Sequence, residues 1–265
     1  MVTPDAATTI ERTYHHPHDD LTVRRAITRI IATHLKPDHH HNWSNFNYDL
    51  TGAHFHNADF TGAHFRGITD FSGAHFHGER TSFAEAQFHG GWTSFADAQF
   101  RSKEWTGFRD AQFRSKEWTS FARAEFHGER TSFDNAQFRS KEWTGFNQAQ
   151  FHGERTSFME AQFHGGRTSF GFAEFHGERT SFAEAQFRSK EWTGFVGAEF
   201  HSEEWTLFAR AEFHSEETLF DSPGAWNNVY FDWDPDPEDP EAVKGTKPDN
   251  VTPHNWPPTV VEPVP

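Results

Sequence analysis

The chain has 265 residues, a formal net charge of −15 at pH 7 and no cysteine. A disulfide framework is therefore excluded, and no run of 18 apolar residues predicts a transmembrane helix. The first twenty residues, MVTPDAATTIERTYHHPHDD, lack the basic start and apolar stretch of a signal peptide. We therefore expect a cytoplasmic protein without a membrane span.

The N-terminal region predicts a disordered segment over residues 1–18, then a capping helix and linker over residues 19–45. The helix is expected from Asp20 to Leu35, with Arg24, Arg25 and Arg29 away from its apolar face. That face contains Val23, Ala26, Ile27, Ile30, Ile31 and Leu35. We expect it to cover the open end of the repeat array that follows, because solenoid ends need caps. The alternative is a basic helix on a membrane surface.

A histidine cluster surrounds this helix, with His39, His40 and His41 after it and His15, His16 and His18 before it. Histidine can ligate metals, but neither cysteine nor a spaced carboxylate completes a defined site here. The preferred interpretation is a solvated linker, and we expect neither a metal nor a cofactor.

The stretch from Thr81 to Phe220 repeats the unit T-x-F-x-x-A-[QE]-F followed by a short variable insert. Its phenylalanines are five, then seven or eight, residues apart, which does not match the period of an amphipathic helix. A fixed short period is typical of a solenoid, and Phe and Thr favour strands. We therefore predict an all-β coil with Phe, Ala and Thr inside, the Thr hydroxyls being placed to bond to the backbone of a neighbouring coil.

Two coil lengths fit this repeat. Two units per turn would give a rectangular coil of about 24–26 residues. One unit per turn would give a flat coil of about 12–13 residues. The rectangular coil is preferred because two rings per coil need more width. It predicts a buried ladder of Phe83, Phe108, Phe133, Phe158, Phe182 and Phe208.

Upstream, YDLTGAHFHNADFTGAHF (Tyr48–Phe65) places Leu50, Phe55, Phe60 and Phe65 five apart, with alanine two places before each phenylalanine. This stretch resembles the bacterial pentapeptide-repeat proteins, with consensus A-[DN]-[LF]-x-x. The resemblance implies a right-handed, four-sided β-helix, which we expect over residues 46–220. The array from 81 onward is a variant in which extra residues follow each pair of pentapeptides, so that the unit lengthens to about 12–13 residues.

The outward positions form two kinds of row. A histidine or arginine follows the second phenylalanine of each unit, which is either a solvated face or a pH-responsive stripe. With two units per coil, Trp or Arg before each threonine gives one row of Arg80, Trp105, Arg130, Arg155, Arg179 and Trp205. The other row, the candidate interaction stripe, contains Trp92, Trp118, Trp143, Arg167 and Trp192. Tryptophan occurs in every three-residue insert, which favours a structural role over partner binding.

Residues 221–265 change composition and predict a C-terminal cap followed by a proline-rich acidic tail. Trp226, Tyr230, Phe231 and Trp233 are expected to cover the last coil. From Pro235 onward we expect disorder, because the segment is rich in proline and charge.

No catalytic constellation is evident, and RSKEWTGF occurs identically from Arg101, Arg139 and Arg188. A repeated surface offers ladders rather than one specific site, so we expect no enzyme but a scaffold or protein-interaction module whose protein partner is unknown. The alternative implied by the resemblance is a DNA mimic that modulates DNA gyrase or another topoisomerase. Residues 81–220 carry 21 acidic and 15 basic residues, only −6, which weakens that alternative. Direct nucleic-acid binding is not expected without a basic patch, and an ice-binding surface is disfavoured because the threonines face inward.

Overall fold

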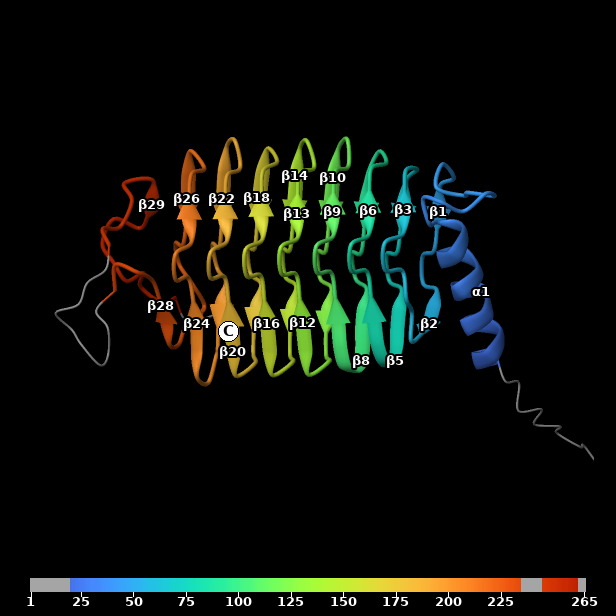
Figure 1. Cartoon of the computed structure of the whole chain (residues 1–265). Helices are drawn as coiled ribbons and strands as arrows, with labels where there is room; N and C mark the ends of the chain where they lie inside the picture. The colour runs from blue at the N-terminus through green and yellow to red at the C-terminus, as the bar shows by residue number, and fades with distance from the viewer. Residues whose placement is uncertain (1–19, 235–244, 262–265) are drawn as a thin grey trace, which may run out of the picture.

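The computed structural model describes residues 20–234 and 245–261. The chain is a parallel β-solenoid whose coils stack into a rod, with helix α1 (Asp20–His34) across one end and strands β28 (Val229–Tyr230) and β29 (Val251–Thr252) at the other (Figure 1). Within the described residues, no helix has the length and hydrophobicity needed to cross a bilayer.

Each coil has four sides, which we number in chain order. Side 1 is a sheet of nine parallel strands. Its strands are β1 (Tyr48–Asp49), β4 (Thr69–Asp70), β7 (Thr93–Ser94), β10 (Trp118–Ser120), β14 (Trp143–Gly145), β18 (Arg167–Ser169), β22 (Trp192–Gly194), β26 (Glu217–Leu219) and β29.

Sides 2 and 3 belong to one sheet of thirteen strands, because two long strands, β5 (His75–Ser82) and β8 (Gln99–Gly107), run around the edge between them. Side 2 also contains β2 (His54–His56), β11 (Glu125–Phe126), β15 (Gln150–Phe151), β19 (Glu174–Phe175), β23 (Glu199–Phe200) and β27 (Ala225–Trp226). Side 3 also contains β12 (Arg130–Ser132), β16 (Arg155–Ser157), β20 (Arg179–Ser181), β24 (Trp205–Leu207) and β28.

Side 4 is a sheet of seven parallel strands. Its strands are β3 (His64–Phe65), β6 (Gln87–Phe88), β9 (Gln112–Phe113), β13 (Gln137–Phe138), β17 (Gln162–Phe163), β21 (Gln186–Phe187) and β25 (Glu212–Phe213).

The strand register gives the length of a coil. Trp143 pairs with Arg167, and Arg179 pairs with Trp205. Each of these pairs joins equivalent positions that lie two units apart in the sequence. The first coil is shorter: Tyr48 pairs with Thr69, as regular pentapeptides require. Each coil of the array therefore contains two units, and the flat coil with one unit per turn is wrong.

The interior is filled by phenylalanine rings that stack along the rod, one stack for each side. Phe83, Phe108, Phe133, Phe158, Phe182 and Phe208 form one stack with ring centroids 4.7–5.1 Å apart and exposed fractions of 0–1 %. Neighbouring stacks meet edge to face, as Phe133 and Phe146 do at 89°. Both geometries are favourable for aromatic pairs, and alanine on the same inner face leaves the space that the rings need.

Two kinds of connection join the sides. Tight corners lie between sides 1 and 2 and between sides 3 and 4. At one such corner Ala124 N donates to Phe121 O at 3.1 Å, and Arg123 has a φ of 56°. The variable inserts form two loop edges, between sides 2 and 3 and between sides 4 and 1. The extra residues therefore widen the coil at two opposite edges.

The threonines lie inside the coil, but their hydroxyls bond to serine rather than to the predicted backbone groups. Thr81, Thr93 and Thr119 each pair with a buried serine from the insert of the next coil, at 2.7–3.0 Å. Where that insert carries glycine instead, at residues 128, 153 and 165, the hydroxyls of Thr106, Thr131 and Thr144 have no hydrogen-bond partner in the described structure. Insert composition therefore decides whether a threonine is satisfied.

Helix α1 lies against the first coil, but its orientation differs from the prediction. Thr28, Ala32 and Leu35 are buried, whereas Val23, Ile27 and Ile30 of the predicted buried face are about half exposed. Leu35 O accepts a hydrogen bond from His64 N, and Ser44 O accepts one from Arg66 N. The rotation of the helix about its own axis is fixed by Leu35 and the linker, because both pair with the open edge of side 4.

The other end is covered by aromatic residues. Phe231 stacks on Phe208 at 4.4 Å, and Trp226 and Trp256 pack edge to face on Phe220. Disorder from Pro235 onward does not extend to residues 245–261, because β29 pairs with β26 and Val251 is fully buried. Backbone pairing with the last coil offsets the poor hydrophobic content of this segment. The predicted disorder of residues 1–18 and 235–244 lies outside the described residues.

Candidate interaction surface

Side 1 carries the row of Trp92, Trp118, Trp143, Arg167 and Trp192 on its outer surface, in register from coil to coil. The rings of Trp92 and Trp118 stack at 4.9 Å, and those of Trp118 and Trp143 at 5.5 Å. All four tryptophans are partly buried. The row is thus a continuous aromatic stack over three coils, with outer edges open to solvent.

Glycine lies beneath three of the rings, those of Trp105, Trp143 and Trp192, and lets them lie close to the sheet. Serine takes this place after Trp92 and Trp118, and leucine after Trp205. A Cβ atom added at Gly145 would stand 2.3 Å from the Trp143 ring, and one at Gly107 would stand 1.8 Å from the Trp105 ring. Each of these three rings therefore packs on the outer face of its own strand.

Arg167 interrupts the stack and leaves a hollow. Its Nε donates to Glu191 Oε2 at 2.7 Å, so the guanidinium is held toward the next coil at the loop edge. The hollow has a volume of about 310 Å³ and is lined by Trp143, Thr144, Asn147, Arg167, Ser169 and Trp192. Asn147 and Ser169 were not predicted from the sequence as surface-site residues. The sequence feature that could have indicated the hollow is the arginine within a row of tryptophans.

Side 3 carries the second row, Arg80, Trp105, Arg130, Arg155, Arg179 and Trp205, again in register. Its two tryptophans are separated by three arginines, so they do not stack on each other. Arg80 pairs with Glu104 at 2.8 Å and Arg179 pairs with Glu204. Side 3 is therefore the natural comparison surface for the stripe on side 1.

Side 2 carries a stack of histidines. The rings of His127, His152, His176 and His201 follow one another at 4.8–5.1 Å. Each Nε2 lies 2.8–3.2 Å from a glutamine or glutamate two residues earlier. Burial lowers the pKa of His152, and the neighbouring rings of His127 and His176 lower it further. The histidine at the centre of the stack therefore favours its neutral form.

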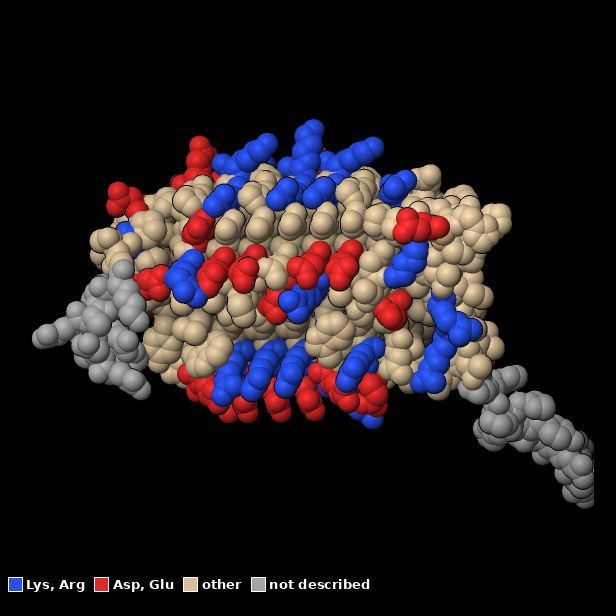
Figure 2. Space-filling view, viewed as in Figure 1, with Lys and Arg blue, Asp and Glu red and all other residues tan. Residues whose placement is uncertain are grey.

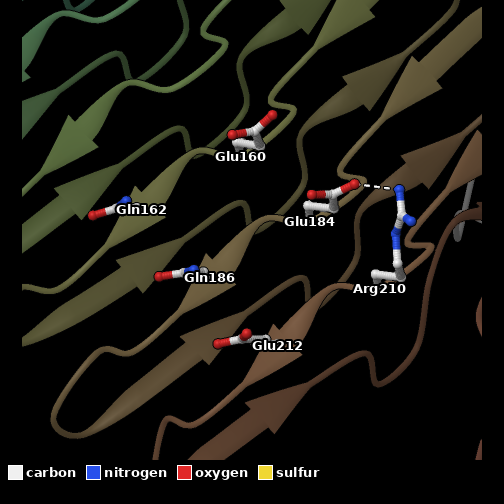
Figure 3. A pocket seen from close by; sticks show the side chains of 6 residues that line it. All are labelled: Glu160, Gln162, Glu184, Gln186, Arg210 and Glu212. Carbon is white, nitrogen blue, oxygen red and sulfur yellow. Dashed lines mark hydrogen bonds and ion pairs between the residues drawn. The ribbon is translucent and has the colours of Figure 1, made fainter.

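A second hollow, of about 320 Å³, lies where the corner between sides 3 and 4 meets side 4 (Figure 3). Glu160, Glu184 and Arg210 stand at the corner, with Glu184 paired to Arg210; Gln162, Gln186 and Glu212 lie on side 4. A hydrogen bond from Arg188 is the main cause that lowers the pKa of Glu212. This carboxylate is held ionised, unlike a general acid, whose pKa lies near the working pH.

Charges of both signs run along the loop edges (Figure 2). Ion pairs also link adjacent coils at a tight corner and on side 4: Arg123 binds Asp97 through two hydrogen bonds of 2.6 and 2.7 Å, and Arg188 binds Glu212 at 2.6 Å. Exposed pairs of this kind add little stability. They do distribute positive charge among the acidic side chains, so the rod is not uniformly negative.

The histidines after α1 contact one another and the helix. His34 stacks on Trp43 at 3.9 Å, and His40 stacks on His39 at 4.8 Å. Within residues 20–234 and 245–261, no group of three or more His, Cys, Asp or Glu side chains is placed to hold a metal ion. His15, His16 and His18 lie outside these ranges.

The comparison with family models identifies part of the rod. Residues 50–99 match the model described as pentapeptide repeats (9 copies). No curated protein matches the chain. No solved structure matches it. The matched segment covers the regular first coils and the start of the array, and strand pairing continues from it without a break to β28 and β29.

Proposed function

We propose that this pentapeptide-repeat solenoid is a non-catalytic scaffold that binds a protein partner through the stripe on side 1. The observation that carries the proposal is the in-register stack of Trp92, Trp118 and Trp143, which leaves aromatic edges open along one flat side. Aromatic side chains are enriched in protein–protein interfaces. A rigid rod holds such a row in place before binding, which reduces the entropic cost of association.

The repetition of the surface supports a binding role over catalysis. An active site needs a nucleophile, a base and an orienting group in one arrangement, whereas the coils present the same side chains at each step. The hollow at Glu184 and Arg210 consists of repeated Gln and Glu positions in paired rows. Binding by the scaffold therefore requires only the row of aromatic side chains on side 1, and the number of coils sets the length of that row.

The experiment compares matched substitutions on two sides of the rod. Trp118→Arg with Trp143→Arg removes the stack on side 1, and Trp105→Arg with Trp205→Arg makes the same chemical change on side 3. Both are compatible with the fold, because Arg130, Arg155, Arg167 and Arg179 already occupy equivalent positions. Proteins from an extract of the native host are captured by cross-linking to each form. A partner retained by the wild type and the side 3 variant, but lost by the side 1 variant, supports the proposal; equal retention by both variants contradicts it.

The alternative function, a DNA mimic that modulates DNA gyrase, requires a different surface charge on the same rod. A mimic needs acidic side chains along its length, and here arginines such as Arg123 and Arg188 pair with acidic residues between coils. A supercoiling assay with the full-length chain separates the two functions. Inhibition that survives the side 1 substitutions would favour the mimic.

A further inference from the structure

One coil departs from the repeat at several positions that meet on side 1. Its loop insert is His-Gly-Gly at residues 164–166, as at residues 89–91, whereas the flanking coils have Arg-Ser-Lys-Glu at residues 139–142 and 188–191. Its outward residue is Arg167 between Trp143 and Trp192. Its corner reads Gly171-Phe172, where the three preceding corners read Ala-Asp, Ala-Arg and Asn-Gln and the following corner reads Val-Gly. Within residues 81–220, this is the coil in which the His-Gly-Gly insert, an outward arginine and a Gly-Phe corner occur together, and this combination needs its own explanation.

These departures lower the outer surface of that coil. Gly166 brings no side chain to the loop edge, and its backbone passes close to the preceding coil, because an added Cβ would stand 2.3 Å from Glu142 O. Gly165 takes the inward position of Ser140 and so does not change the outer surface. Gly171 lies beside Asn147 and Ser169, which line the hollow. This hollow lies at β18, the strand between β14 and β22 (Figure 1), and is called the groove below.

Aromatic groups bound this groove. Trp143 and Trp192 stand two coils apart, about 9.6 Å from a strand spacing of about 4.8 Å, with the arginine stem between them. Phe172 stands at the corner of the same coil, outside the lining of the groove, with 61 % of its surface exposed and a φ of 56°. Its ring rests over Gly197, where an added Cβ would stand 2.5 Å from a ring carbon. An exposed bulky residue in the left-handed region is unusual, and the glycine one coil later makes room for it.

Cations are placed at the loop end. Within the described residues, Arg167 uses Nε for its bond to Glu191, and its two terminal NH₂ groups have no hydrogen-bond partner. Lys141 and Lys190 occupy the same edge on the flanking coils, since Gly166 N donates to Lys141 O and Lys190 N donates to Gly165 O. Lys141, Arg167 and Lys190 outnumber Glu142 and Glu191, so the loop end favours a carboxylate.

We propose that this groove binds a segment of a partner protein in which an aromatic side chain stands next to a carboxylate. The aromatic ring packs against Trp143 or Trp192, and the carboxylate accepts hydrogen bonds from the terminal NH₂ groups of Arg167. The proposal rests on the proposed function of side 1 and names the kind of segment that this side recognises.

The test fills the groove with the repeat's own residues. Arg167→Trp with Ser169→Gly recreates the Trp-Thr-Gly sequence of β14 and β22, which closes the gap and keeps the fold. Arg179→Trp with Ser181→Gly makes the same change on side 3 as the control. Arg167→Gln leaves the groove open and removes its cation. The probe is a fluorescein-labelled peptide, Gly-Phe-Asp-Gly, measured by fluorescence anisotropy beside Gly-Leu-Asp-Gly and Gly-Phe-Asn-Gly.

We expect the probe to bind the wild type and the side 3 control alike, and to bind the groove-filled form at least about tenfold more weakly, as loss of a charge-assisted hydrogen bond implies. With Arg167→Gln, the Asp and Asn peptides should bind equally. Probe binding that is absent from the wild type, or unchanged by filling the groove, overturns the inference. A partner that is lost with Trp118→Arg but kept after groove filling would also overturn the inference, while leaving the scaffold function intact. Probe binding to the groove without any partner on side 1 would support the inference and contradict the scaffold function.

Discussion

Thr119 Oγ1 lies 2.7 Å from Ser140 Oγ, inside the coil and one step along the rod. The hydroxyl of Thr144, the next threonine on the same side, has no hydrogen-bond partner in the described structure. The difference follows from the inserts, because residue 140 is serine and its successor, residue 165, is glycine. Two threonines with the same local sequence therefore contribute differently to stability.

We predict opposite responses to an isosteric substitution. Thr119→Val removes a buried hydrogen bond and should lower the free energy of unfolding by about 1 kcal/mol. Thr144→Val removes a buried hydroxyl without a partner and should leave stability unchanged or raise it. Chemical denaturation of the two variants beside the wild type measures the difference. Equal losses would show that the hydrogen bond to Ser140 is not what stabilises Thr119.

Phe133 provides a test of the core. Its ring is fully buried between Phe108 and Phe158 at 4.8 Å from each. Phe133→Ala should cost about 3–5 kcal/mol, because neighbouring coils can only partly close the cavity. Met159→Ala, at an exposed corner, is the control and should have little effect. A negligible shift in the melting of the Phe133 variant would mean that the ring is not buried.

The N-terminal cap predicts a change in association. Leu35 is fully buried and its carbonyl accepts the bond from His64 N. Deleting residues 1–41 should expose the edge of the first coil and promote self-association, since an open strand edge pairs with other chains. Light scattering after size-exclusion chromatography measures the mass. Ile27→Ser, on the exposed side of α1, should leave the mass unchanged; a truncated form that stays monomeric and equally stable would exclude the capping role.

The histidine stack predicts a pH dependence. The folded state lowers the pKa of His152 below its ordinary value of 6.5, chiefly through burial. The unfolded chain therefore binds the proton more readily, so stability is fully present above about pH 6.5 and falls as the pH is lowered through that value. Denaturation midpoints at several pH values should show a smaller fall for His152→Gln than for the wild type. His214→Gln, at a more exposed ring, is the matched control.

The sequence by itself determined the type of fold and the filling of its core. The five-then-seven-or-eight spacing of phenylalanine is incompatible with a helix, and every phenylalanine of the array's T-x-F-x-x-A-[QE]-F framework is buried. Repetition made this prediction robust, because each coil imposes the same inward pattern on the next. The in-register rows of Trp and Arg also follow from the count of residues in two units.

Only the tertiary structure decided the features that depend on contacts between coils or between segments. The rotation of α1, with Ile27 exposed and Leu35 buried, depends on how the linker pairs with side 4, which the helical period does not specify. The pairing of Val251 with the last coil joins residues more than thirty positions apart. The groove at Arg167 arises because glycines at the loop edge and at the corner, separate in sequence, meet on one side of the same coil.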